Sequence, residues 1–174
     1  AFDGDADRCF VVDERGELVN PSTLTGLIAT QELQRVPGAP VIHNVITSRA
    51  VPEIIAENGG VPVVTRVGHS FIKETMAQTG AVFGGEHSGH FYFADFWRAD
   101  SGMLAALHVL SRLSNSSDAT TLSNLLVPYE RYVLSGEINT EVADQSAAIA
   151  AVRAHFAGQD VTFSDLDGLT VDGG

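Results

Sequence analysis

Residues 41–84, VIHNVITSRAVPEIIAENGGVPVVTRVGHSFIKETMAQTGAVFG, contain the alternation that decides the fold. Apolar runs rich in valine and isoleucine alternate with segments of helical periodicity, and glycine or proline separates them. We expect strands over 41–46, 61–67 and 81–84, one helix beginning near Ser48, and a second from about Ser70 to Gln78. This order is typical of βαβ units, so it predicts an α/β domain with a mostly parallel sheet and flanking helices.

The flanking sequence extends this pattern on both sides. Upstream, Ser22 is expected to cap a helix whose apolar face carries Leu24, Leu27 and Ile28. Downstream, 91–94 is predicted as a strand, and Asp100 or Ser101 as the cap of a further helix. A stripe at helical spacing on that helix is expected to be core, and it consists of Met103, Leu107, Leu110 and Leu113.

From Tyr129 onward the pattern changes. A strand-like run through Ile138 is followed by a helix on which Ile149, Val152 and Phe156 align, and then by a strand over 161–163. We interpret this region as the start of an α+β C-terminal domain. Because the sequence opens without methionine, inside a motif, we expect it to be a piece of a longer protein.

Composition limits the function classes. The 174 residues are 44% hydrophobic, enough for one ordinary domain with pieces of its neighbours. A formal net charge of −12 and a pI of 4.7 argue against nucleic acid or an anionic membrane as a partner. No apolar run reaches the length of a membrane span. The single cysteine, Cys9, is expected to be buried and fits a reducing compartment, so we predict a cytoplasmic location.

The segment Asp3-Gly4-Asp5-Ala6-Asp7-Arg8 places three carboxylates at alternate positions. Oxygen ligands of this kind suit Mg²⁺, which keeps part of its coordination for water or phosphate. The pattern therefore favours a phosphate-handling enzyme, and the alternative is a solvated acidic turn.

Polar side chains also follow each of the three predicted parallel strands. These groups are Thr47-Ser48-Arg49, Gly68-His69-Ser70 and Gly85 to His90. Because ligands of α/β sheets bind outside the carboxyl ends of the strands, we expect all three groups at one edge. Taken singly, the serines could be helix caps and His69 a structural residue.

The turn Gly85-Glu86-His87-Ser88-Gly89-His90 is unusually dense in hydrogen-bonding groups. Glu86 and Ser88, two residues apart, have the spacing to bind a pair of vicinal hydroxyls on a sugar. The alternative is a hairpin that carries polar residues incidentally.

Together these motifs resemble the α-D-phosphohexomutase family. Asp3 to Arg8 resembles its metal loop, Gly85 to His90 its sugar-recognition loop, and Thr65 to Lys73 the segment that leads into the active-site helix of its third domain. The Glu-His-Ser-Gly-His form of the sugar loop is most similar to the phosphomannomutase and phosphomannomutase/phosphoglucomutase branch.

The resemblance implies a four-domain isomerase that moves phosphate between the 1 and 6 positions of a hexose through a phosphoserine and a hexose 1,6-bisphosphate. It implies that Asp3, Asp5 and Asp7 hold Mg²⁺. The 3- and 4-hydroxyls of the sugar would be bound by Glu86 and Ser88, and Gly68 is assigned to substrate binding. Arg8 would contact the transferring phosphate or steady the loop, and His69 and His90 would contact the substrate and transfer protons. Some members carry a lysine after the strand that ends near Ile46; Arg49 would supply that positive charge to the substrate, although an arginine cannot act as a base.

On the same basis, residues 1–15 are the tail of domain 2, 16–128 are domain 3, and 129–174 are the front of domain 4. The family's catalytic serine loop would precede this sequence and its phosphate-binding loop would follow it, so we expect no turnover by this chain alone. Its partners would be a mannose or glucose phosphate and the missing domains of the parent protein.

Several alternatives stay open at this point. The parent could be a phosphoglucosamine mutase or phosphoglucomutase, because the recognised hydroxyls do not include C2, where mannose and glucose differ. It could also be a non-catalytic module that binds sugar phosphates. An EF-hand is disfavoured because Arg8 occupies the position that needs glycine. A haloacid-dehalogenase-type phosphatase also uses an Asp-x-Asp motif, but with a hydroxyl residue beyond it and a preceding strand that is not visible in this sequence, so it ranks second among enzymes.

Overall fold

The computed structural model describes residues 1–117 and 120–174. These form two compact units, Ala1–Tyr132 and Val133–Gly174, each with its own internal contacts. We describe each unit by itself. Within the described residues, no helix combines the length and apolar character needed to cross a membrane.

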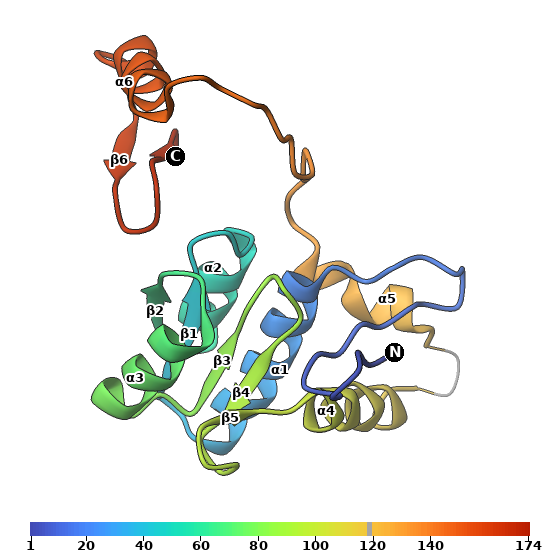
Figure 1. Ribbon diagram of the computed structural model, residues 1–174. Coiled ribbons are helices and arrows are strands. Elements are labelled where there is room, and N and C mark those ends of the chain that lie inside the picture. The colour runs from blue at the N-terminus through green and yellow to red at the C-terminus, as the bar shows by residue number, and fades with distance from the viewer. Residues whose placement is uncertain (118–119) are drawn as a thin grey trace. The chain divides into compact units, whose positions relative to one another are not determined.

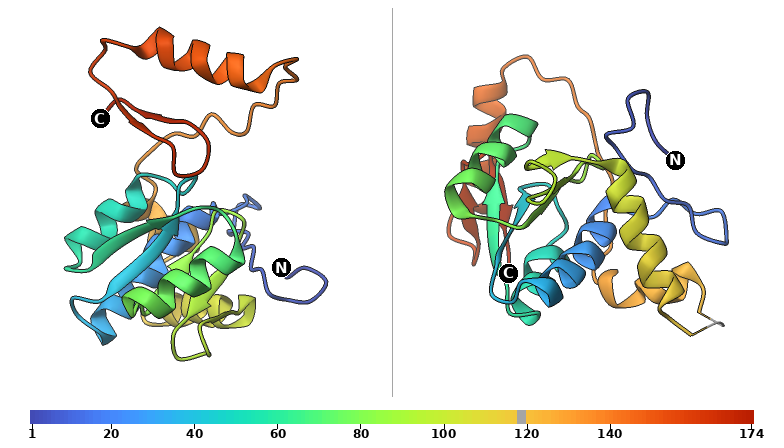
Figure 2. Two further views of the ribbon diagram at one scale, coloured as in Figure 1. Left: turned by 60° about the vertical axis from the view of Figure 1, so that its left-hand side comes forward. Right: turned by 90° about the horizontal axis from the view of Figure 1, so that it is seen from below.

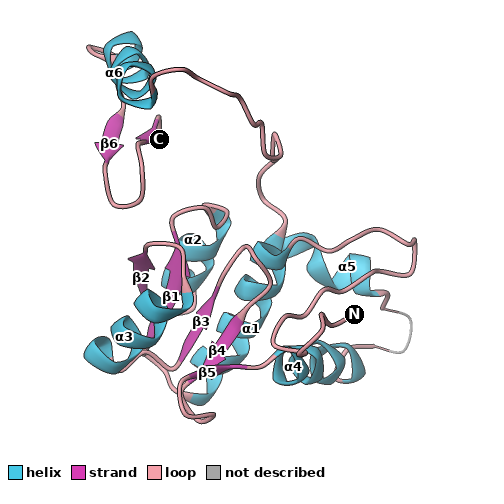
Figure 3. Ribbon diagram, viewed as in Figure 1, coloured by secondary structure: helices cyan, strands magenta, loops and turns pink. Residues whose placement is uncertain are grey.

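The first unit is built on a five-stranded sheet with the order β2-β1-β3-β4-β5 (Figures 1 and 3). β1 pairs in parallel with β2 and β3, whereas β3–β4 and β4–β5 are antiparallel. The α/β class is confirmed, and the sheet is mixed because a tight hairpin joins β3 to β4. The strands are β1 (Pro40–Asn44), β2 (Val61–Thr65), β3 (Phe83–Gly85), β4 (Phe91–Phe93) and β5 (Ala99–Asp100).

Helices cover both faces of this sheet (Figure 2). α1 (Pro21–Arg35) packs against α2 (Ala50–Glu57) and α4 (Gly102–Ser114) on one face, and α3 (His69–Thr79) lies on the other. The two successive crossovers, β1-α2-β2 and β2-α3-β3, run in opposite directions along the sheet, so two crossovers of the same hand place α2 and α3 on opposite faces. The short helix α5 (Leu122–Leu126) and the 3₁₀ turn Val127–Tyr129 complete the unit.

Each face of the sheet has its own apolar cluster. On one face Val41 of β1 joins Leu24, Leu27 and Ile28 of α1, which are fully buried as the sequence predicts. On the other face Ile42 packs with Ile72 and Met76 of α3 and with Tyr92 of β4. The alternation of Val41 and Ile42 between faces is the period-2 geometry of a strand that is buried on both sides.

The predicted core stripe on α4 is wrong. Met103, Leu107 and Leu110 are 58–62% exposed, and the buried positions of α4 are Gly102, Ala105 and Val109. α4 turns its small residues inward because its first turn lies against the backbone of residues 6–8. A Cβ at Gly102 would clash with the carbonyl group of Arg8. Close approach of two backbones therefore decides which face of α4 is buried.

The second unit contains α6 (Gln145–Phe156) and an antiparallel pair, β6 (Thr162–Ser164) and β7 (Thr170–Asp172). Asp144 caps α6 by accepting a hydrogen bond from the amide of Ala147 at 2.9 Å. The strand predicted from Tyr129 to Ile138 is wrong, because residues 130–144 contain no helix or strand and Ile138 is 79% exposed. An isolated strand lacks the hydrogen-bonding partner that stabilises it.

Candidate functional site

The ends of β1, β2 and β3 meet at the carboxylate of Glu86, which directly follows β3. The side-chain amide of Asn44, at the end of β1, donates to Glu86 Oε1 at 3.2 Å. The backbone N–H of Gly68, in the turn after β2, donates to the same oxygen at 3.1 Å. The expected convergence of the strand ends at one edge of the sheet is thus confirmed.

Glu86 is held from the other side by Tyr92 of β4. The Tyr92 hydroxyl donates to Glu86 Oε2 at 2.8 Å, and Asn44, Glu86 and Tyr92 are each at most 1% exposed. Burial and the neighbouring carboxylate of Glu86 raise the pKa of Tyr92. A buried carboxylate needs such donors. Sequence reasoning missed Asn44 and Tyr92, since both lie within apolar strands and look like parts of the core.

The turn from Glu86 to His90 is a tight hairpin, closed by the N–H of Glu86 on the carbonyl of His90 at 3.0 Å. Ser88 Oγ lies 2.9 Å from Nδ1 of His90, and Glu86 Oε2 lies 3.7 Å from that nitrogen. The Nε of Arg8 donates to Nε2 of His90 at 3.2 Å. Because Nε2 is the acceptor, this arrangement places the proton of a neutral imidazole on Nδ1. Burial, and then the nearby His69, lower the pKa of His90.

The aspartate loop is attached to this hairpin through its backbone. Arg8 and His90 form an isolated antiparallel bridge, and the N–H of Cys9 donates to the carbonyl of Gly89 at 3.0 Å. Cys9 itself is free and buried, as predicted. Two segments that are 80 residues apart in the sequence therefore form one structure.

The three aspartates of the loop fit a hard cation. One oxygen from each of Asp3, Asp5 and Asp7 lies within 4.8 Å of the others. Burial tends to raise the pKa of Asp3, but the hydrogen bond from the Arg8 amide at 3.3 Å and the charge of Arg8 outweigh it and lower the pKa. Three carboxylates that converge on one point are a donor set that suits Mg²⁺.

A further ionic group lies beside His90. His69, the first residue of α3, has its ring 4.2 Å from the His90 ring, and its Nδ1 is 3.3 Å from Asp100. Lys73, one turn further along α3, pairs with the other oxygen of Asp100 at 3.1 Å. Sequence reasoning treated Asp100 as a possible helix cap only, and Ser101 is the residue that caps α4.

Arg49, another of the predicted site residues, lies in the loop between β1 and α2. It directly precedes α2 and forms an ion pair with Glu53 of the next turn at 3.4 Å. Ser48, beside it, donates its N–H to Ser22 Oγ, which also lies 3.1 Å from Nδ1 of His87. The loop after β1 is therefore linked to the hairpin through Ser22 and His87.

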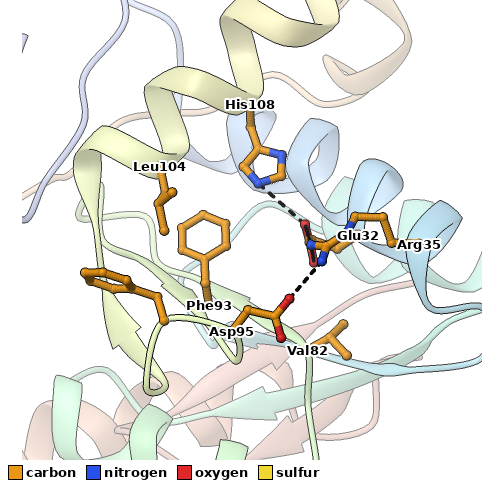
Figure 4. Close-up of a pocket in the computed structure, with 8 residues that line it drawn as sticks. Glu32, Arg35, Val82, Phe93, Asp95, Leu104 and His108 are labelled. Carbon is orange, nitrogen blue, oxygen red and sulfur yellow. Dashed lines mark hydrogen bonds and ion pairs between the residues drawn. The ribbon is translucent and has the colours of Figure 1, made fainter.

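Other residues form a separate cavity of about 300 Å³ between α1, α4 and β4 (Figure 4). Its walls combine apolar side chains with the buried carboxylate of Glu32, which pairs with Arg35 at 2.9 Å and with His108 at 3.4 Å. Arg35 also binds Asp95 at 2.8 Å. Nothing in the sequence pattern singled out this cluster, because its members come from three distant segments.

Comparison with known proteins identifies the family. A family model described as phosphoglucomutase/phosphomannomutase, alpha/beta/alpha domain III, matches residues 20–132. The chain belongs to this family. The resemblance seen in the sequence is thereby confirmed, and so is the fold class. The aspartate loop, at residues 3–8, lies outside the matched range.

Individual relatives support this assignment. The chain is 38% identical to a phosphomannomutase from Vibrio cholerae and 40% identical to one from Salmonella typhimurium, over 99% and 98% of its length. A crystal structure of a phosphoglucomutase/phosphomannomutase family protein from Burkholderia thailandensis covers 99% of the chain with a TM-score of 0.82 at 34% identity. The chain spans 37% of each of the two phosphomannomutases and 36% of the Burkholderia chain.

Proposed function

We propose that this chain carries the metal-binding and sugar-recognising parts of a phosphohexomutase. The parent enzyme would interconvert the 6-phosphate and 1-phosphate of a hexose, mannose or glucose, through a phosphoserine and a hexose 1,6-bisphosphate. The observation that carries the proposal is the junction of the two loops: Arg8 reaches from the aspartate loop to His90 of the sugar hairpin at 3.2 Å. A phosphate at the metal and a sugar at the hairpin would then belong to one substrate.

In this proposal Asp3, Asp5 and Asp7 hold Mg²⁺. When bound, the ion would neutralise charge on the phosphate as it is transferred. Arg8 is anchored by Asp3 at 3.4 Å and by His90, so its guanidinium is oriented before substrate arrives. Such pre-orientation lowers the cost of positioning a phosphate.

Ser88 and Glu86 differ in how a sugar could reach them. Ser88 is half-buried, so its hydroxyl is within reach of a ligand, whereas Glu86 is 1% exposed and already accepts three hydrogen bonds. In our proposal Ser88 makes the first contact, and Glu86 contacts the sugar only when the hairpin opens. His69 has a side chain that is 46% exposed, and with His90 it would handle protons at the reacting hydroxyl. Gly68 and Arg49 keep their assignments as candidate substrate-binding residues.

The predicted boundaries of the domains, at 15/16 and 128/129, also stay part of the proposal. So does a cytoplasmic location for the parent, which the single free cysteine supports.

The proposal is tested on the parent enzyme with mannose 1-phosphate and glucose 1-phosphate as substrates. We expect Ser88→Ala and Glu86→Ala to lower kcat/KM, and Glu57→Ala to leave it unchanged. Glu57 is a suitable control because it is exposed and pairs with Arg131 on a different surface. Since Glu86 is buried, circular dichroism must show that its variant is folded.

Unchanged turnover in both Ser88→Ala and folded Glu86→Ala would refute the sugar-binding assignment. Binding of the sugar phosphate without any turnover by the wild-type parent would instead favour a non-catalytic module. In the chain alone, mannose 1-phosphate should shift the amide resonances of Ser88 and His69. The ratio of the two turnover rates decides between mannose and glucose.

A further inference from the structure

Four side chains converge beside the aspartate loop and combine two imidazoles with two carboxylates. Asp7, His69, His90 and Asp100 each offer a ligand atom within 4.8 Å of those of the other three. They come from separate segments: the aspartate loop, the start of α3, the hairpin and β5. His90 is 4% exposed and the Asp100 side chain is 8% exposed, so the packing of the unit fixes both residues.

Two nitrogen–oxygen distances within this tetrad are close to those between the ligands of a tetrahedral metal site, and all four ligand atoms lie within 4.8 Å of one another. Nδ1 of His69 lies 3.3 Å from Asp100 Oδ2, and Nε2 of His90 lies 3.6 Å from Asp7 Oδ1. Zinc bonds to nitrogen and oxygen imply ligand atoms about 3.4 Å apart at tetrahedral angles. The two nitrogen–oxygen pairs are brought together by the edge-to-face contact of the histidine rings, whose centroids are 4.2 Å apart.

A second observation points to a ligand at this place. Oδ1 of Asp7 is buried and has no hydrogen-bond partner within residues 1–117 and 120–174, although the Asp7 side chain as a whole is 30% exposed. An unsatisfied buried oxygen costs about 1–3 kcal/mol, and more when it is charged. A cation coordinated by Asp7 and His90 would satisfy it.

Two positively charged side chains contact residues of the tetrad in the structure. Lys73 Nζ lies 3.1 Å from Asp100, and Arg8 Nε donates to Nε2 of His90 at 3.2 Å. Both side chains are about half exposed, at 44% and 45%. A metal ion would therefore have to displace Lys73 from Asp100 and Arg8 from His90, and both long side chains have access to solvent when displaced.

We propose that Asp7, His69, His90 and Asp100 bind a divalent transition-metal ion of the zinc class. Two imidazole ligands favour zinc and its neighbours over Mg²⁺, which prefers oxygen ligands only. Because Asp7 also belongs to the aspartate triad, an ion in the tetrad competes with an ion held by Asp3, Asp5 and Asp7. The site is inferred from the geometry of these four residues and does not depend on the proposed function.

Co²⁺ is the probe that tests the site, since tetrahedral Co²⁺ absorbs visible light far more strongly than octahedral Co²⁺. The 174-residue chain is titrated with Co²⁺, and we expect intense visible bands. Asp100→Asn and His69→Gln should each abolish the intense bands. Asp5→Asn, which alters the triad only, should leave them unchanged. Lys73→Met should increase the affinity for Co²⁺ because it removes a competing cation. Added Mg²⁺ should weaken Co²⁺ binding in the wild type more than in Asp5→Asn.

The opposite pattern overturns the proposal: intense bands that are lost in Asp5→Asn and kept in Asp100→Asn would assign the ion to the triad. A folded wild-type chain that gives only the weak absorption of octahedral Co²⁺ would also overturn it. His69 has a half-exposed side chain, so His69→Gln keeps the test informative even if Asp100→Asn fails to fold.

Discussion

Gly102 is expected to control the position of the aspartate loop although it lies more than 90 residues away in the sequence. A Cβ at this position would lie 2.7 Å from the carbonyl carbon of Arg8, closer still to the Arg8 carbonyl oxygen, and 3.0 Å from the carbonyl oxygen of Ala6. Ordinary van der Waals contact begins at 3.4 Å. These neighbours are backbone atoms, so the strain is relieved only if the loop or the start of α4 moves, by about 1 Å.

We therefore predict that Gly102→Ala displaces the loop more than it destabilises the unit. Overpacking costs about 1–3 kcal/mol, whereas replacing glycine by alanine in a helix gains up to about 1 kcal/mol. Because Gly102 is the first residue of α4, the helix-propensity gain should be small, and the net loss of unfolding free energy should be about 3 kcal/mol or less. A shift of the supporting structure around a metal site lowers the metal affinity about 10–100-fold, and we expect that effect here.

The matched control is Gly4→Ala, a substitution inside the loop itself. A Cβ at Gly4 has no neighbour within 4 Å, and the φ angle of Gly4 is not positive. The two variants are compared by the hydrogen exchange of the Cys9 amide, which donates to the carbonyl of Gly89, and by Mn²⁺ affinity. Gly102→Ala should speed Cys9 exchange and weaken Mn²⁺ binding, and Gly4→Ala should change neither.

Wild-type protection of the Cys9 amide in Gly102→Ala would refute the reasoning, because the loop would then have absorbed the methyl group without moving. The exchange measurement needs no bound ion. Its result is therefore independent of whether the aspartates hold Mg²⁺.

Two further predictions concern buried polar groups. Tyr92→Phe removes the hydroxyl that donates to the buried Glu86, so the free energy of unfolding should fall by about 1–3 kcal/mol. Tyr132→Phe, which removes an exposed hydrogen bond, should change the free energy of unfolding by about 0.5 kcal/mol or less. Equal midpoints of urea unfolding for the two variants would contradict this prediction. Burial lowers the pKa of His108, so as the pH falls the unfolded state takes up a proton before the folded state does, and stability should fall below about pH 6.5. Urea unfolding at pH 7.5 and 5.5 measures this loss, and His108→Gln should make it smaller. An equal loss of stability between the two pH values in wild type and His108→Gln would contradict the burial argument.

The sequence could predict that the polar groups of the candidate site converge, because their convergence follows from topology. Parallel strands joined by helices end at one edge, so the groups after residues 44, 65 and 85 had to converge. The links within the site could not be predicted in this way. Asp100 looks like a helix cap and Tyr92 like a core aromatic, and only the antiparallel pairing of β3, β4 and β5 brings them to the hairpin and α3.

α4 illustrates the same limit in the packing. The apolar period of Met103, Leu107 and Leu110 is genuine, and it correctly indicates a helix. Periodicity does not indicate which of two faces has a neighbour close enough to bury it. The first turn of α4 must accommodate the backbone at Arg8, which only glycine allows, and this contact rotates the small-residue face inward.

The buried position of Glu86 also couples the Glu86–His90 hairpin to α3. Its Oε1 accepts the N–H of Gly68, which adopts a φ of 128° and directly precedes His69 at the start of α3. A ligand hydroxyl that binds this oxygen must share it with Gly68 or displace the Gly68 N–H. Displacement would release the turn that orients His69. In the proposed function, occupation of Glu86 by a sugar would therefore reposition His69, so the hairpin and the first turn of α3 should move together when substrate binds.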